Sequence, residues 1–297
     1  MQYYSSGKIL VSGEYLVLNG ADAFALPTVF GQFIEVLPTS NNFVQWTSAN
    51  ADNSVWFNAK FSLDLSKIIE TSNIESVKTL QKLLQFIKNS KPELFENPLQ
   101  FTTRLTFDKD WGLGSSSTFI ANLAKWSGTD AFKLSNISLG GSGYDIAVAL
   151  AQKPILYHLN NQKPEWKKID FLPPFTDKLW FVYLNRKQNS REGIKTYQKN
   201  EASQARIEEI SQISKQIAVC QDYRQFCQLL DQHEVILSEI LQRPTVKQAL
   251  FPDFKGTIKS LGAWGGDFVL ATGEDAVAYF TSKGYDTVIA YKDFIEV

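Results

Sequence analysis

The sequence has few of the residues that build metal centres and disulfides. Its 297 residues include two histidines and two cysteines. Cys220 and Cys227 lie in a segment that we expect to be helical, where buried apolar thiols are favoured over a disulfide or a metal pair. His158 and His233 have no cysteine or histidine at metal-ligand spacing, so a zinc site is not indicated, and His233 is expected to be a packing residue. A serine hydrolase is not supported either, because the G-x-S-x-G segment is absent.

An excess of either charge is also lacking. The 30 basic and 31 acidic side chains are well mixed and give a net charge of -1. This balance argues against a nucleic-acid-binding surface and against a polybasic membrane contact. No apolar run is long enough to span a bilayer, and the start, MQYYSSGKIL, lacks the basic and apolar regions of a signal peptide. We therefore expect a cytoplasmic protein with no nucleic-acid or membrane partner.

The first half of the sequence predicts a mixture of strands and helices. KILVSGEYLVL and GQFIEVLP are predicted strands, and FVQWTS and SVWFNAKF are predicted to form a hairpin. Apolar residues at helical spacing predict a helix over 72–89, and a strand is expected over 99–107. A Pro-rich stretch near residue 170 marks the expected boundary between two lobes, 1–170 and 171–297.

The second half begins with a predicted strand, LWFVYL, followed by two long helices. Their apolar stripes predict one helix from about Arg191 to Cys220 and another from about Tyr223 to Gln242. The chain then alternates as strand, glycine turn, strand, helix and strand. The whole pattern indicates an α+β fold.

The segment GLGSSSTF, residues 112–119, combines two glycines with three serines directly before a predicted helix. Glycine allows positive φ and a close approach of a ligand to the backbone. The first N–H groups of a helix and its positive dipole end attract anions, so the segment is a candidate phosphate loop. It is not the G-x-x-x-x-G-K-[ST] loop, because no lysine follows the second glycine. The alternative is a polar turn with a serine at the helix N-cap.

Three more segments contain glycines beside chemically useful residues. SGKILVSGEY places Lys8 in the first predicted strand, GGSGYD places Asp145 at the start of a helix, and GAWGG, residues 262–266, forms a turn between strands. Taken alone, Asp145 could be an N-cap and Lys8 a solvated strand residue.

In this order, the four segments resemble those of the GHMP kinase superfamily, which includes galactokinase, homoserine kinase, mevalonate kinase and phosphomevalonate kinase. The resemblance extends from residue 5 to about residue 273, and GEY at residues 13–15 is closer to phosphomevalonate kinases than to the GEH of many mevalonate kinases. It implies a two-lobed α+β fold, with an N-terminal lobe like domain 2 of ribosomal protein S5 and a ferredoxin-like C-terminal lobe. It also implies an ATP- and Mg²⁺-dependent kinase acting on a small, anionic molecule.

The resemblance assigns roles to individual residues. Asp145 would be the general base for the acceptor hydroxyl, and Lys8 would stabilise the developing negative charge. The ATP phosphates would be bound by Gly112, Leu113, Gly114, Ser115, Ser116 and Ser117, with the Ser116 hydroxyl on Mg²⁺. The substrate would contact residues of the first and third motifs, of the aspartate segment and of the helix start at 187–191. These residues are Glu14, Tyr15, Ser142, Gly143, Lys187, Ser190, Arg191, Gly262, Ala263, Gly265 and Gly266.

The sequence departs from the family pattern at three places. DKDW, residues 108–111, replaces the family's proline-rich approach to the second motif, and Asp110 would repel a triphosphate unless it points away or faces the metal. The family has a glutamate for Mg²⁺ between the phosphate loop and the aspartate, but here the only acidic residue between Ser117 and Asp145 is Asp130. Either Asp130 replaces that ligand, or the metal relies on Ser116, the phosphates and water. Trp264 stands where the third motif usually has glycine, so we expect its ring to narrow the pocket or to displace the turn.

Three functions are compatible with these observations. The first is a GHMP-type kinase, with mevalonate or phosphomevalonate as the expected kind of substrate. The second is a non-catalytic protein of the same fold that binds a nucleotide or metabolite. The third is an enzyme similar to diphosphomevalonate decarboxylase, which would release CO₂ along with ADP. The sequence leaves open whether the protein is a monomer or a homodimer.

Overall fold

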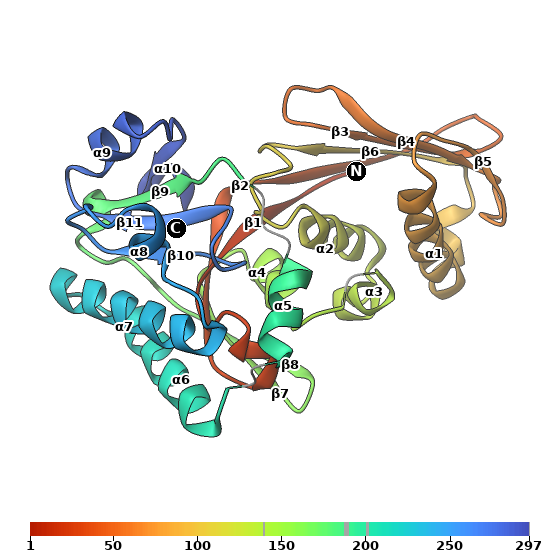
Figure 1. Cartoon of the computed structure of the whole chain (residues 1–297). Coiled ribbons are helices and arrows are strands. Elements are labelled where there is room, and N and C mark those ends of the chain that lie inside the picture. The colour runs from red at the N-terminus through yellow and green to blue at the C-terminus, as the bar shows by residue number, and fades with distance from the viewer. Residues whose placement is uncertain (139, 187–189, 200–201, 297) are drawn as a thin grey trace. The chain divides into compact units, whose positions relative to one another are not determined.

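The computed structural model describes residues 1–138, 140–186, 190–199 and 202–296 and has the predicted mixed α+β composition (Figure 1). The chain forms two compact units. The first comprises Met1–Gly7, Phe30–Lys109 and Gly114–Leu150, and the second comprises Lys8–Val29, Asp110–Leu113 and Ala151–Val297. This division differs from a single boundary at residue 170 because the long strands β1 (Gln2–Ser12) and β2 (Ala23–Pro38) contribute to both units.

The first unit is a sheet covered by helices on one face (Figure 1). Its strands follow the order β5-β4-β3-β6-β2, with β3 and β6 parallel and the other neighbours antiparallel. The elements are β3 (Val44–Ala49), β4 (Val55–Phe61), β5 (Ile68–Thr71), α1 (Ile74–Ser90), a 3-10 helix (Pro92–Phe95), β6 (Leu99–Leu105), α2 (Ser115–Ser127), α3 (Ala131–Ser138) and α4 (Tyr144–Ala151). The predicted β3–β4 hairpin, helix α1 and strand β6 are thus confirmed.

The core of this unit lies between the sheet and the helices. Along β6, buried residues alternate with half-buried ones, as expected for a strand with one face against the core. The ring of Trp46 stacks on Phe101 at 4.8 Å between centroids, and Trp126 of α2 meets Phe101 edge to face. Aromatic packing therefore holds α2 against the sheet.

The second unit contains a four-stranded antiparallel sheet with the order β10-β11-β9-β12. Its elements are a 3-10 helix (Leu16–Asn19), β7 (Ile155–Asn160), β8 (Lys163–Lys168), a 3-10 helix (Thr176–Lys178), β9 (Leu179–Tyr183), α5 (Ser190–Lys199), α6 (Gln204–Val219), α7 (Tyr223–Leu241), α8 (Val246–Leu250), β10 (Ile258–Ser260), β11 (Phe268–Thr272), α9 (Ala276–Ser282), β12 (Val288–Ala290) and α10 (Tyr291–Phe294). From β9 onward the order of strand, helices, two strands, helix and strand is that of a ferredoxin-like arrangement.

Two predicted elements have different bounds in the structure. The strand predicted over KILVSGEYLVL ends at Ser12, because Gly13 and Tyr15 have φ of 90° and 61° and turn the chain into a 3-10 helix. The single helix predicted over 191–220 consists of α5 and α6. The Ser203 side chain accepts a hydrogen bond from the N–H of Arg206 and begins α6 as a separate helix.

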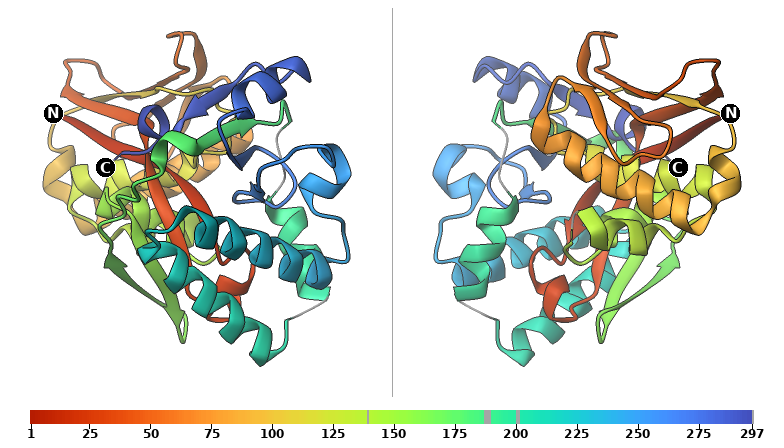
Figure 2. Two further views of the ribbon diagram at one scale, coloured as in Figure 1. Left: turned by 90° about the vertical axis from the view of Figure 1, so that its left-hand side faces the viewer. Right: turned by 90° about the vertical axis from the view of Figure 1, so that its right-hand side faces the viewer.

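Helices α6 and α7 lie side by side (Figure 2). The predicted helix over 223–242 is confirmed as α7, which begins at the N-cap Asp222 and buries Leu230 and Leu237 on one face. Within the described part of the chain, no helix combines the length and the apolar character that crossing a bilayer requires.

Candidate active site

Lys8 contacts the segment before α2 through both its backbone and its side chain. Its N–H donates to the carbonyl of Leu113 at 3.0 Å, and its Nζ donates to the carbonyl of Gly112 at 2.8 Å. The Lys8 side chain is half-buried in β1. The structure therefore places the lysine of the first motif in contact with the first glycine of the candidate phosphate loop.

Asp267, at the start of β11, lies against the same glycine. A Cβ atom on Gly112 would be 2.2 Å from Asp267 Oδ2, and the φ of Gly112 is 68°. The backbone of Asp267 has a φ of 47° and is fixed on both sides. Its N–H donates to the carbonyl of Arg186, and its carbonyl accepts from the N–H of Leu184. We predicted no role for Asp267 from the sequence, although it directly follows the third glycine turn.

The third glycine turn, residues 262–266, is hydrogen-bonded to β1, the strand of the first motif. The N–H of Gly262 donates to the carbonyl of Leu10 at 3.2 Å, and the N–H of Gly266 donates to that of Ala263 at 3.3 Å. Gly262 and Gly265 have φ of 67° and 87°, and a Cβ on either would meet no atom of the described residues within 4 Å. These glycines are therefore required by their backbone conformation and face open space, which leaves room for a ligand.

The start of α2 presents an uncapped helix end. Gly114 is the N-cap with φ 85°, and among the described residues no side chain caps it. The buried Ser117 hydroxyl donates to the carbonyl of Gly114 at 2.8 Å, whereas Ser115 is half-buried and Ser116 is exposed. The alternative of a serine N-cap is therefore wrong. The free N–H groups and the positive dipole end suit an anion.

Buried polar contacts hold α2 on the sheet. The amide of Asn122 accepts from the Ser5 hydroxyl and donates to the carbonyl of Gln32, both at 2.8 Å. The Thr118 hydroxyl donates to Oε1 of Gln32 at 2.9 Å. Because each of these residues is buried, losing one partner would leave an unsatisfied polar group. The loop-bearing end of α2 is thus rigidly positioned within its unit.

Asp145 is the second residue of α4, after a glycine-rich turn. Gly140, Gly141 and Gly143 have φ of 68°, 92° and 81°, which only glycine adopts easily. Asp145 is half-buried, and its Oδ1 accepts from the N–H of Ile146 at 3.0 Å. The neighbouring Ser142 is buried. Asp145, Ser142 and Gly143 belong to the first unit, whereas Lys8 and the third turn belong to the second.

Asp130 lies at the opposite end of α2 from Ser116. Its Oδ1 accepts from the N–H groups of Phe132 and Lys133 at 2.8 and 3.3 Å, so it caps the start of α3. The helical rise from Ser116 to Ser127, the end of α2, amounts to about 16 Å. One Mg²⁺ with ligands at about 2.1 Å cannot contact both side chains. Of the two alternatives, the structure favours a metal held by Ser116 without Asp130.

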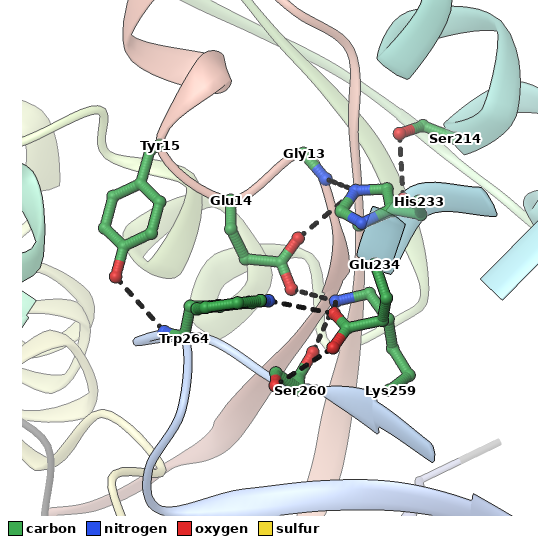
Figure 3. A network of polar contacts seen from close by, with 10 residues as sticks. Gly13, Glu14, Tyr15, Ser214, His233, Glu234, Lys259, Ser260 and Trp264 are labelled. Atoms are coloured by element: carbon green, nitrogen blue, oxygen red, sulfur yellow. Dashed lines mark hydrogen bonds and ion pairs between the residues drawn. The ribbon is translucent and has the colours of Figure 1, made fainter. Parts of the chain in front are cut away.

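Glu14 is buried rather than available to a substrate. It is 1% exposed, its Oε1 is ion-paired with Nζ of Lys259, and its Oε2 lies 3.3 Å from Nε2 of His233 (Figure 3). Lys259 also lies 3.2 Å from Glu234 Oε1. We call Glu14, His233, Glu234 and Lys259 the buried ion cluster. The predicted substrate contact of Glu14 is replaced by a structural role, because every face of its carboxylate meets protein.

The buried ion cluster includes a group that titrates near neutral pH. Burial raises the pKa of Glu14 to about 7, although Lys259 partly opposes the shift. Burial lowers the pKa of His233 well below its usual value, and the positive charge of Lys259 adds to this. Burial alone would lower the pKa of Lys259, but the carboxylates of Glu14 and Glu234 outweigh it and raise that pKa. Near neutral pH the cluster therefore contains a charged lysine and a neutral histidine.

The contact between Glu14 and His233 favours the protonated form of the carboxyl group. Nε2 of His233 accepts a hydrogen bond from the N–H of Gly13 at 3.0 Å, so it carries a lone pair rather than a hydrogen. Glu14 Oε2 lies 3.3 Å from this nitrogen and has no hydrogen-bond partner in the described part of the chain. An ionised Oε2 would face the lone pair of Nε2, and protonation of the carboxyl group would reduce this repulsion. The geometry thus agrees with the raised pKa of Glu14.

The side chain of Trp264 points toward Glu234 and the buried ion cluster (Figure 3). It is 4% exposed, and its indole N–H donates to Glu234 Oε1 at 3.0 Å. Its backbone N–H donates to the hydroxyl of the buried Tyr15 at 3.1 Å. The expectation that the ring narrows the pocket is wrong, because the indole is packed against the buried ion cluster.

From the sequence we predicted no role for Lys259 or Glu234, and we expected His233 only to pack and not to make polar contacts. One signal was present: Glu234 lies between Leu230 and Leu237 on the apolar face of α7, where an unpaired charge would be costly. A charged residue at such a position predicts a buried partner. The sequence does not identify the partner, because Lys259 and Glu14 come from distant segments.

The remaining predicted substrate residues lie at the start of α5. Lys187 is outside the described residues. Ser190 and Arg191 are the first two residues of α5, and Gly193 follows on the same helix. A Cβ on Gly193 would be 2.3 Å from the Tyr15 hydroxyl oxygen, so α5 packs closely against the first motif. In the described residues, no three histidine, cysteine or acidic side chains gather as a metal site.

Comparisons with known proteins identify the fold. No protein-family model and no curated protein sequence matches the chain. Among solved structures, Methanococcus jannaschii mevalonate kinase has a TM-score of 0.70 at 17% identity, covering 97% of this chain and 96% of that one. Streptococcus pneumoniae phosphomevalonate kinase, solved with phosphomevalonate and AMPPNP, has 0.70 at 16% identity, with 96% and 95% covered. Lactococcus lactis galactokinase, complexed with galactose, has 0.65 at 12% identity, with 97% and 92% covered. The chain therefore has the fold of the GHMP kinases.

Proposed function

We propose that the chain is an ATP- and Mg²⁺-dependent kinase that phosphorylates a hydroxyl or phosphate group of a small anionic molecule. The observation that supports this most directly is the contact of Lys8 with Gly112, in a chain that matches kinase structures over nearly its whole length. A strand lysine bonded to the glycine loop before a helix is suited to binding a transferred phosphoryl group. The open third turn, joined to the same strand at Leu10, supplies further backbone donors.

In the proposed reaction Asp145 accepts the proton of the acceptor hydroxyl. The acceptor oxygen then bonds to the γ-phosphorus of ATP as the bond to the leaving oxygen breaks, and ADP is released. Lys8 stabilises the negative charge on the transferring group. The N–H groups at the start of α2 bind the triphosphate, with Gly112 and Gly114 providing the backbone conformation.

The residues present fit Mg²⁺ only as a partly hydrated ion. Mg²⁺ usually keeps several waters and takes one or two protein ligands together with substrate phosphates. The exposed Ser116 hydroxyl at the start of α2 is an available oxygen, and Asp130 is not near it. Bound Mg²⁺ would neutralise charge on the phosphates, and Ser116 would orient it.

A mevalonate-like or phosphomevalonate-like acceptor is the best-supported substrate class. Two of the compared structures are kinases of these compounds, one of them containing phosphomevalonate. The first motif reads GEY, as in phosphomevalonate kinases. Arg186, whose guanidinium donates to the carbonyl of Gly265, places a positive charge at the third turn. A cation there suits a carboxylate or phosphate on the acceptor.

The test is ADP release with ATP and Mg²⁺ across mevalonate, phosphomevalonate, homoserine and simple sugars. We expect turnover with one of the first two and its loss in Asp145→Asn, which keeps the size of the side chain but cannot accept the proton. Nucleotide affinity should be nearly unchanged in this variant. Turnover that survives in Asp145→Asn would contradict the assignment of the base.

A non-catalytic nucleotide-binding protein of the same fold is the alternative. The position of Asp130 favours it, because the only acidic residue between the phosphate loop and Asp145 caps α3 instead of facing Ser116. Binding of ATP without turnover on any acceptor would establish this function. Release of CO₂ together with ADP would instead indicate a decarboxylase, and failure to bind any nucleotide would contradict all three.

A further inference from the structure

Trp264 occupies a glycine position of the third motif, and its surroundings give it a specific task. The turn contains Gly262, Gly265 and Gly266, residues with large backbone freedom in the absence of restraints. Ordering such a segment costs conformational entropy at every residue. A turn that must present backbone N–H groups to a ligand therefore benefits from an anchor that fixes it in advance.

Trp264 is this anchor, and it makes two hydrogen bonds. The indole N–H of Trp264 donates to Glu234 Oε1 at 3.0 Å, and its backbone N–H donates to the Tyr15 hydroxyl at 3.1 Å. Both bonds are buried, so water does not compete for them. Together they fix both the side chain and the main chain at the middle of the turn.

Glu234 is itself held in position by the neighbouring strand. Its Oε1 lies 3.2 Å from Nζ of Lys259, and its Oε2 accepts from the Ser260 hydroxyl at 3.2 Å. Lys259 is in turn ion-paired with Glu14 of the first motif (Figure 3). The acceptor for the indole is therefore a fixed, charged oxygen, which makes a stronger hydrogen bond than a neutral one.

We propose that Trp264 and Glu234 are positioning residues that hold the third glycine turn in its ligand-ready conformation. The proposal rests on the proposed function, because it takes the turn to contact the acceptor or the phosphates. Neither side chain touches the ligand. Trp264 acts through the peptide groups of residues 262–266, and Glu234 acts through Trp264.

The first test is amide hydrogen exchange, which needs no substrate. Trp264→Phe removes the indole N–H and keeps an aromatic ring. Exchange in residues 262–266 should accelerate by about tenfold or more, because tenfold corresponds to one ordinary buried hydrogen bond and the acceptor here is charged. The matched control is Trp180→Phe in the same unit, because the Trp180 indole N–H has no acceptor within the described part of the chain. This control should leave exchange in the turn unchanged.

The second test is kinetic. In Trp264→Phe, kcat/KM should fall about tenfold with the accepted substrate, whereas the thermal midpoint should fall no further than in Trp180→Phe. Should Trp264→Phe fail to fold, Tyr15→Phe removes the acceptor of the Trp264 backbone N–H and should also accelerate exchange in the turn.

The outcomes separate the two proposals. Unchanged exchange and unchanged kinetics in Trp264→Phe and Tyr15→Phe would overturn the positioning role. Equal acceleration throughout the second unit would overturn it too, because Trp264 would then stabilise the unit in general. Faster exchange confined to the turn, in a protein without kinase activity, would support the positioning role and reject the proposed function.

Discussion

The carboxylate of Asp267 occupies the space that a Cβ atom on Gly112 would need. The ideal Cβ position is 2.2 Å from Asp267 Oδ2 and 2.5 Å from its Cγ. Gly112 also has a φ of 68°, and Asp267 has one of 47°. Positions 112 and 267 are thus sterically coupled, because a side chain at 112 would require the Asp267 carboxylate to move.

Gly112→Ala should therefore lower the free energy of unfolding by more than the cost of placing an alanine in a left-handed conformation. The positive φ costs an alanine about 1–2 kcal/mol, and the overlap with Asp267 adds to this. Gly128→Ala is the control, because Gly128 has a φ of 67° and no atom of the described residues within 4 Å of its Cβ position. Adding Asp267→Gly should recover the steric part, as measured by urea unfolding in a double-mutant cycle. Equal losses in Gly112→Ala and Gly128→Ala would contradict this.

The Glu14–His233 contact makes a prediction about pH. The pKa of Glu14 is raised from 4.5 to about 7 in the folded state, so its favourable contribution is complete below pH 4.5 and is lost as the pH rises through 7. The pKa of His233 is lowered from 6.5, so its folded state is penalised as the pH falls below 6.5. In the wild type the two contributions to the free energy of unfolding change with pH in opposite directions between pH 4.5 and 6.5. The reason is that folding moves one proton from the histidine to the carboxyl group.

Substitution of either residue should reveal how the other one alone makes the free energy of unfolding depend on pH. In His233→Gln, whose amide oxygen can accept from Gly13 and Glu14, the free energy of unfolding should fall as the pH rises from 4.5 to 7, by about 3 kcal/mol in all. In Glu14→Gln it should rise with pH up to 6.5. Urea unfolding across this range measures both, with Glu35→Gln at an exposed position of β2 as the control. Parallel pH profiles in all variants would mean that the two groups do not share the proton.

Local patterns predicted much of the fold and part of the site. The periodicity of α1 and α7 and the alternation of β6 were sufficient, because these elements bury one face against a core. The Lys8–Gly112 contact agreed with the motif order. The break between α5 and α6 was missed because the apolar stripe continues across Ser203. Glu14 was assigned to the substrate because its partners, Lys259 and His233, come from distant segments.

Ser116 and Asp130, the two candidate metal ligands, lie at opposite ends of α2, so their substitution should affect Mg²⁺-ATP binding differently. Ser116→Ala should weaken Mg²⁺-ATP binding several-fold and leave binding of metal-free ATP nearly unchanged, because it removes one oxygen ligand from an exposed site. Asp130→Asn should leave both affinities unchanged, since it affects only the cap of α3 at a cost of about 1 kcal/mol or less. Calorimetric titration with and without Mg²⁺ measures the difference. A Mg²⁺-specific loss in Asp130→Asn would restore Asp130 as a ligand.

Removal of Lys259 should be the most damaging single change in the second unit. Its ammonium group is fully buried and contacts Glu14 and Glu234, so Lys259→Met leaves buried carboxylates without a counter-charge. Breaking a buried ion pair in this way typically costs about 3–5 kcal/mol. A second change, Glu234→Gln, removes the stranded charge and should recover part of the loss, whereas Glu14→Gln should recover less because Glu14 takes up a proton near neutral pH. Unfolding of the three variants at pH 8 and pH 6 tests this order, and the advantage of Glu234→Gln over Glu14→Gln should persist at pH 8, because the loss of Lys259 removes the charge that lowers the pKa of Glu14. Equal recovery by both substitutions at pH 6 would mean that Glu14 is charged there.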